Sequence, residues 1–62
     1  MYYRYYGKTL QLQDLKNHQL VIKLSIVDGK VKIQNPRTNK VQYVSEELFN
    51  KYFKLSSEKY YL

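Results

Sequence analysis

A chain of 62 residues makes at most one domain, here residues 1–62, and a domain of this size buries only about 60% of the surface that its unfolded chain exposes. Because the chain has no cysteine and only one histidine, neither disulfides nor a metal centre can stabilise so small a core, and we expect no cofactor. We expect the chain to gain stability by forming a homodimer instead. The 11 Lys and Arg residues oppose five Asp and Glu residues, and the net charge of +6 suits acidic partners, nucleic acid included, as well as simple solubility.

The first element is a short tyrosine-rich segment, which runs Tyr2-Tyr3-Arg4-Tyr5-Tyr6. In a strand, alternate tyrosines point to opposite faces, so both faces of this segment need cover. One small domain can rarely bury both faces of such a strand, and tyrosine is enriched at protein interfaces. We therefore predict that this segment contacts another copy of the chain or a partner. The alternative is that these tyrosines only cover the small core. Tyr60 and Tyr61 form a second cluster near the other end.

The N-terminal residues lack the apolar core that a signal peptide needs. No run of the sequence reaches the roughly 18 apolar residues of a membrane span. The absence of cysteine is compatible with a reducing compartment. We therefore expect a cytoplasmic protein without a membrane partner.

Residues 8–19 carry two competing patterns. Leu10 and Leu12 alternate as in a strand, whereas Leu12 and Leu15 have the spacing of a helix. We favour a strand over residues 8–14. No simple loop to the next strand then keeps every apolar side chain inward, so we also expect a bulge or a short helical turn.

The clearest strand covers residues 20–27, in which every second residue is apolar: Leu20, Ile22, Leu24 and Ile26. The Asp-Gly pair at 28–29 predicts a two-residue hairpin, because both residues tolerate the positive φ of a type I′ turn. This hairpin sets Ile26 opposite Val31. It also sets Leu24 opposite Ile33, so that apolar side chains meet on the core face.

The second connection, residues 35–40, is rich in turn-forming residues. A three-residue loop with Asn39 in the left-handed conformation pairs Ile33 with Tyr43 and keeps both on the core side. A four-residue loop would instead pair Lys32 with Tyr43 and mix the two faces. We therefore predict the three-residue loop.

A helix is predicted to begin directly after Ser45. Ser45 is a good N-cap residue, and Glu46 and Glu47 suit the positive end of the helix dipole. Val44 can pack on Phe49 as a hydrophobic staple. The apolar stripe of this helix consists of Leu48, Phe49, Tyr52 and Phe53, and we expect it to cover the inner face of the sheet.

These elements predict an α+β fold, a small antiparallel β-meander of four to five strands closed by one C-terminal helix, with an SH3-like barrel as one form of it. The predicted outer face carries mostly polar and basic residues: Lys23, Ser25, Lys30, Lys32, Gln34 and Gln42, interrupted by Val21, Val27 and Val44. The face is basic, but it lacks the several aromatics and arginines that a nucleic-acid-binding sheet usually presents.

The sequence offers no catalytic constellation. His18 lies in a polar turn segment and has no neighbouring nucleophile and acid that would form a triad. Glu46 and Glu47 are explained by the start of the helix. There is also no P-loop, no dinucleotide-binding glycine motif and no zinc-ligand spacing. We expect a protein that is not an enzyme.

The segment VQYVSEELFNKYFK, residues 41–54, resembles the end of many short proteins encoded by phages and prophages of AT-rich bacteria, in which a last strand leads into a helix. The abundance of Lys, Asn, Tyr and Ile, with no Ala, suits the same source. The resemblance implies an accessory protein that binds and inhibits one host protein, such as a host-takeover or anti-defence factor, in the bacterial cytoplasm. It assigns no active residues.

Three functional hypotheses follow. The first is binding to a host protein, and the second is a small basic nucleic-acid-binding module that acts through the lysine-bearing sheet face. The third is a structural subunit of a larger assembly. The predicted partner-binding residues are Tyr2, Tyr3, Arg4, Tyr5, Tyr6, Lys23, Lys30, Lys32, Arg37 and Lys40.

Overall fold

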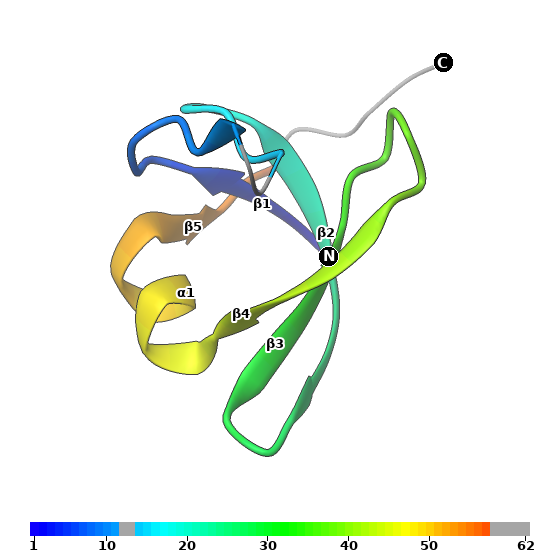
Figure 1. The fold of residues 1–62 in the computed structure, drawn as a ribbon, viewed down its shortest axis with the longest axis vertical. Coiled ribbons are helices and arrows are strands. Elements are labelled where there is room, and N and C mark those ends of the chain that lie inside the picture. Colours follow the sequence, from blue (N-terminus) through cyan, green and yellow to red (C-terminus); the bar gives the residue numbers. More distant parts are fainter. Residues whose placement is uncertain (12–13, 58–62) are drawn as a thin grey trace.

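The computed structural model describes residues 1–11 and 14–57, which form one antiparallel sheet and a short helix (Figure 1). In chain order the elements are β1 (Tyr2–Tyr5), β2 (Leu20–Val27), β3 (Lys30–Gln34), β4 (Val41–Ser45), α1 (Glu46–Tyr52) and β5 (Phe53–Leu55). The predicted α+β class, with an antiparallel sheet and one helix near the C-terminal end, is confirmed. The fifth strand follows the helix, which the sequence did not predict.

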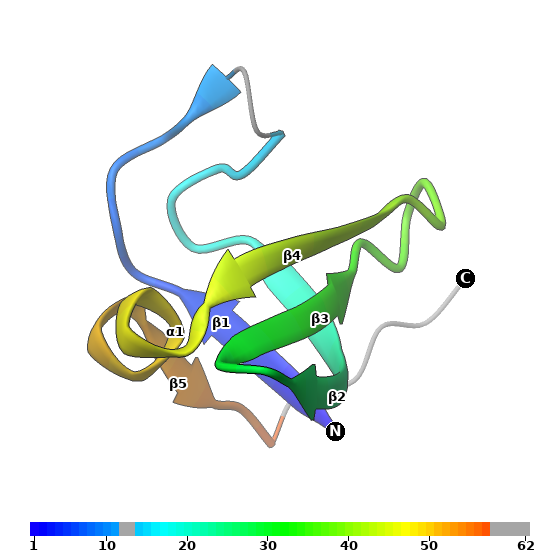
Figure 2. The ribbon, with the colours of Figure 1, turned by 60° about the horizontal axis from the view of Figure 1, so that its bottom comes forward.

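The strands lie in the order β4-β3-β2-β1-β5, because β5 returns after the helix to pair with β1. Within the described residues, the edge strands β4 and β5 do not pair with each other, so the sheet is not closed into a barrel and the SH3-like barrel form of the prediction is wrong. Helix α1 contacts β3, β4 and β5 (Figure 2). It therefore covers the inner face of the sheet between the two edges.

The helix begins as its sequence predicts. Ser45 is the N-cap, and its hydroxyl oxygen accepts a hydrogen bond from the backbone N–H of Leu48 at 3.1 Å. Phe49 is buried, but the helix ends at Tyr52, before the predicted stripe is complete. Phe53 is instead the first residue of β5, and its ring stacks on Phe49 at a centroid distance of 4.8 Å.

The hairpin from β2 to β3 has the predicted turn but only part of the predicted register. Asp28 and Gly29 both have positive φ, and Ile26 pairs with Val31 as expected. Beyond this point a β-bulge at Leu24 shifts the register, so that Lys23 and not Leu24 lies opposite Ile33. One extra residue reverses the facing of all earlier residues of β2.

The hairpin from β3 to β4 has the register that we rejected, with Lys32 opposite Tyr43. Asn35 makes a four-residue loop favourable: its side-chain oxygen accepts from the N–H of Arg37 at 2.9 Å, and its own N–H donates to the carbonyl of Lys40. Asn39 is left-handed, as predicted. One side-chain and one backbone hydrogen bond of Asn35 therefore support this register.

These two register changes alter which residues form the core. Val21 and Val44, predicted on the outer face, are buried beside Val31 and Ile33. Leu24 (45%) and Tyr43 (57%), both predicted to face the core, are exposed. Ile26 keeps its predicted place opposite Val31 and is nevertheless 44% exposed. The core is completed by Leu15 and by three aromatic residues: Tyr5, Phe49 and Phe53.

The strand predicted over residues 8–14 is not found in its described residues, 8–11 and 14, while residues 12–13 lie outside the described part of the chain. Leu10 and Leu15 form an isolated β-bridge, with Leu10 N–H donating to Leu15 C=O at 2.7 Å and the reverse bond at 3.1 Å. Asp14 turns the chain with a positive φ of 54°. The bridge holds Leu10 beside Leu15, which is fully buried in the core.

Tyr5 lies in the core, and its hydroxyl donates to the backbone carbonyl of Lys8 at 2.7 Å. Burial raises the pKa of Tyr5 above its ordinary value of 10.0, with a smaller contribution from Tyr52. The folded protein thus holds this proton more tightly than the unfolded chain does. The associated stability is fully present below about pH 10 and is lost as the pH rises through the pKa of the folded state.

Replacement Tyr5→Phe should lower the free energy of unfolding at neutral pH by about 1 kcal/mol, because the carbonyl of Lys8 loses its donor. The difference from the wild type should then shrink above about pH 10, since only the wild type loses the stability linked to this proton. Urea unfolding of both proteins at a series of pH values measures this difference. If the difference in free energy of unfolding stays constant well above pH 10, the raised pKa of Tyr5 is contradicted.

Candidate interaction surface

The N-terminal tyrosines are divided between the two sides of β1. Tyr5 is buried, and Tyr3 packs edge-on against Phe49 at a centroid distance of 4.9 Å. Tyr2 is half-buried on the outer side, opposite Ile22. The interpretation that the tyrosines cover the core therefore applies to Tyr3 and Tyr5, whose rings are already engaged within the domain.

Tyr6 follows β1 and is 45% exposed. Its ring lies edge-on to His18 at 5.3 Å, and the ammonium of Lys54 lies 5.5 Å from its centroid. Arg4, on the outer side of β1, donates from its guanidinium to the backbone carbonyl of His18. Tyr6 and Arg4 thus join the loop to β1 and β5. The predicted cluster of Tyr60 and Tyr61 lies outside the described residues.

Lys23 does not belong to the outer basic face, where the sequence placed it. Because of the bulge it lies opposite Ile33, and its ammonium is 5.4 Å from the ring centroid of Phe49 and 5.6 Å from that of Tyr3. A cation over aromatic rings is attracted by their π-electrons. Lys23 therefore caps the rim of the core on the inner side.

The outer face of β2, β3 and β4 combines lysines with exposed apolar residues. Lys30 and Lys32 lie on this face of β3, with Tyr43 opposite Lys32. Val27 (56% exposed) lies opposite Lys30, and Val41 (45% exposed) follows on β4. We call these five residues the outer patch. A shallow hollow of about 320 Å³ at one end of the patch is lined by Val27, Asp28, Lys30 and Tyr43.

The sequence predicted Lys30 and Lys32 as surface residues but missed Tyr43, which the wrong register had placed in the core. The signal that could have found Tyr43 is the staple between Val44 and Phe49. That staple requires Val44 on the inner face, and it therefore directs its neighbour Tyr43 outward.

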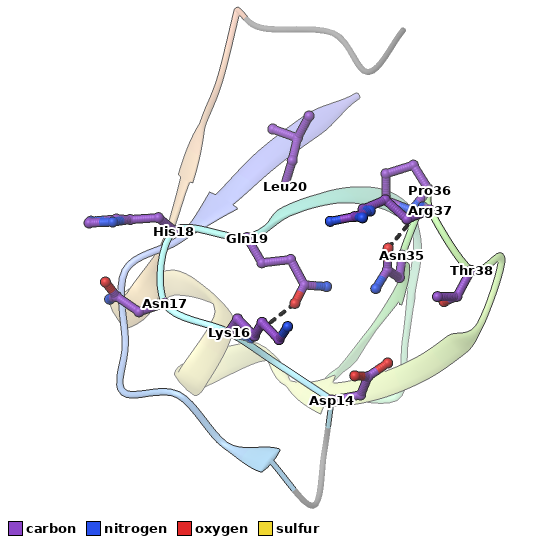
Figure 3. Close-up of a pocket in the computed structure, with 10 residues that line it drawn as sticks. All are labelled: Asp14, Lys16, Asn17, His18, Gln19, Leu20, Asn35, Pro36, Arg37 and Thr38. Carbon is purple, nitrogen blue, oxygen red and sulfur yellow. Dashed lines mark hydrogen bonds between the residues drawn. The ribbon is translucent and has the colours of Figure 1, made fainter. Parts of the chain in front are cut away.

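Arg37 and Lys40 lie in the exposed turn between β3 and β4, at the end of the hairpin away from Lys30. Arg37 also lines a second, larger hollow of about 570 Å³ between this turn and residues 14–20 (Figure 3). Its other charged or titratable lining residues are Asp14, Lys16 and His18. Of the predicted basic residues, Lys30 and Lys32 thus lie in the outer patch and Arg37 lies at the polar hollow. The other three belong to neither place: Arg4, Lys23 and Lys40.

Gln19 lies in the wall of the larger hollow (Figure 3). Its side-chain oxygen accepts from the backbone N–H of Lys16 at 2.9 Å. Its amide nitrogen is buried and has no hydrogen-bond partner within residues 1–11 and 14–57. Buried donors of this type are normally satisfied, so the hollow suits a small polar group better than an apolar one.

Among the described residues, no group of three or more His, Asp or Glu side chains could hold a metal ion. No helix in this part of the chain is long and apolar enough to cross a membrane. Comparison of the chain with models of protein families, with curated proteins and with solved structures finds no significant match.

Proposed function

We propose that this chain is a binding protein that docks an acidic surface of a partner protein on the outer patch. The observation that carries the proposal is the exposure of Tyr43 and Val27, both more than half exposed, beside Lys30 and Lys32. An apolar centre that includes a tyrosine and has a charged rim is typical of protein interfaces. The lysines add attraction to an acidic partner and exclude basic ones.

The resemblance of residues 41–54 to short phage and prophage proteins suggests the setting. In that setting the partner is a bacterial host protein, and the accessory protein inhibits it in the host cytoplasm. The net charge of +6 supports an acidic target. Tyr3 and Tyr5 were predicted to contact a partner, but this proposal leaves them out because they pack within the domain.

Reversal of two charges on the outer patch tests the proposal. The double variant Lys30→Glu/Lys32→Glu should weaken capture of the partner from bacterial lysate at least about tenfold, because acidic groups would then face an acidic surface. Tyr43→Ala should weaken it through loss of apolar contact. Mass spectrometry of the captured proteins measures both effects.

The matched control is Lys8→Glu/Lys16→Glu, which makes the same change in net charge at two other exposed lysines. Capture should survive in this control. If both double variants lose the partner equally, the attraction comes from the overall charge and not from the outer patch. If the wild type recovers no stoichiometric protein, the proposal fails.

A second candidate function is nucleic-acid binding, favoured by the cross-strand pair of Lys32 and exposed Tyr43. A base can stack on the tyrosine while lysines contact phosphates. In that case Lys30→Gln/Lys32→Gln should reduce the slope of log binding constant against log salt by about 2, because two phosphate contacts are lost. Fluorescence anisotropy with labelled DNA and RNA oligonucleotides measures the slope. Absence of binding at low salt would reject this function.

A further inference from the structure

The edge strand β4 lacks the features that normally prevent strands from pairing between molecules. Edge strands are commonly protected by charges, by proline, by bulges or by short length. Residues Val41–Ser45 contain no charge and no proline, and their pairing with β3 runs without a bulge. The other edge, β5, is only three residues long and carries Lys54 at its centre. The two edges therefore differ, and β4 is the unprotected one.

The outer edge of β4 presents regularly spaced backbone groups. The carbonyl of Lys40 accepts from the N–H of Asn35, so the backbone of Lys40 faces β3. Backbone direction alternates along a strand, which turns the backbone groups of Val41, Tyr43 and Ser45 away from β3. No strand of the described residues pairs with them. Val41 and Tyr43 also have exposed side chains, so a further strand can pair here without a change in the fold.

We propose that a second copy of this chain occupies this edge, with the two β4 strands antiparallel and centred on Tyr43. This register sets Tyr43 opposite Tyr43 of the partner subunit. It sets Val41 opposite Ser45 of the partner subunit, and Lys40 opposite Glu46 of the partner subunit. The last pair occurs twice by symmetry, so opposite charges meet at both ends of an uncharged strand.

Charge selects this register over its neighbours. Each copy carries a net charge of +6, so two copies repel each other at long range. A shift of the register by two residues in either direction would remove both alignments of Lys40 with Glu46 of the partner subunit. The pairing centred on Tyr43 joins the two sheets into one and brings the two outer patches side by side. The inference does not depend on which molecule the outer patch binds.

Sedimentation velocity over about 1 µM to about 1 mM protein tests the inference. The mass of the wild type should rise from 7.6 kDa towards twice that value with concentration. Tyr43→Lys should raise the dissociation constant of the dimer at least about tenfold, because two lysines would then face each other at the centre. The matched control is Leu55→Lys on β5, which is 60% exposed and should leave the dimer unchanged.

A charge exchange tests the register itself. Lys40→Glu and Glu46→Lys should each weaken the dimer, and the double variant should restore it, since the opposite charges again meet. Circular dichroism confirms that each variant is folded. A wild type that stays monomeric throughout, or a dimer that Leu55→Lys disrupts and Tyr43→Lys does not, would overturn the inference. Failure of the double variant to restore the dimer would reject this register.

Discussion

Replacement Phe49→Ala should unfold the domain. Phe49 is 4% exposed, stacks on Phe53, contacts Tyr3 edge-on and lies beneath the ammonium of Lys23. Removal of a buried phenylalanine ring typically costs about 3–5 kcal/mol. A single core in a domain of this size rarely supplies more than about 3–5 kcal/mol in total. The loss therefore equals most of the stability available.

Circular dichroism at 25 °C should show the Phe49→Ala chain largely unfolded, while the wild type shows sheet and helix. The control is Leu55→Ala, because Leu55 is 60% exposed and its replacement should change the free energy of unfolding by less than about 0.5 kcal/mol. If Phe49→Ala melts within a few degrees of the wild type, the helix is not the element that completes the core.

The parts of the fold that local signals determine were predictable from sequence. Ser45 satisfies a free N–H at the start of the helix, and this bond forms between residues only three positions apart. The Asp-Gly pair at 28–29 has the positive φ values that its turn requires. Each of these signals lies within a few residues of the structure that it determines, so no knowledge of the remaining chain is needed.

The registers of the two hairpins were harder to predict, because apolar residues stand on both faces of β2 and β4. Val21 and Ile22 are adjacent and similar, and alternation alone does not select the buried one. The bulge at Leu24 makes that selection by inserting one residue. In β4 the predicted register places Tyr43 in the core and the smaller Val44 on the outer face. The helix leaves room for Val44 opposite Val31, and the larger Tyr43 lies outside.

The candidate site was predicted only in part for the same reason. Lys30 and Lys32 lie in β3, whose alternation was right, and they are on the outer face as expected. Lys23 moved to the inner side with the bulge, and Tyr43 moved to the outer side with the longer loop. A one-residue error in register therefore exchanged the residues of the core and those of the surface.

The loop before β2 and the strand β5 depend on distant parts of the chain. Leu15 lies outside the strand predicted over residues 8–14, yet it is fully buried. Asn17 holds the loop in place by donating from its side chain to the carbonyl of Gly7 at 2.7 Å. β5 forms because β1 offers an edge beside the end of the helix. Such contacts join residues far apart in sequence, which a local pattern does not record.

Gly7→Ala should destabilise the domain by about 2–4 kcal/mol, although alanine is the smallest possible addition. A Cβ at this position would lie within 2.7 Å of ring atoms of Tyr5, far inside van der Waals contact. That ring has little room to move, because it packs against Phe53 at a centroid distance of 5.0 Å and donates to the carbonyl of Lys8. Overpacking of a filled core costs about 1–3 kcal/mol, and loss of the hydrogen bond would add about 1 kcal/mol.

Gly29→Ala is the matched control, because it makes the same chemical change at the chain's other glycine. Gly29 has a φ of +73°, and no atom lies within 4 Å of a Cβ built there, so the cost is backbone strain alone, about 1 kcal/mol. Urea unfolding should therefore rank the wild type above Gly29→Ala and Gly29→Ala above Gly7→Ala. The double variant Gly7→Ala/Tyr5→Phe should recover part of the loss, because removal of the hydroxyl relieves the closest contact. If Gly7→Ala is the milder of the two single changes, Tyr5 does not pack against the turn at Gly7 as described.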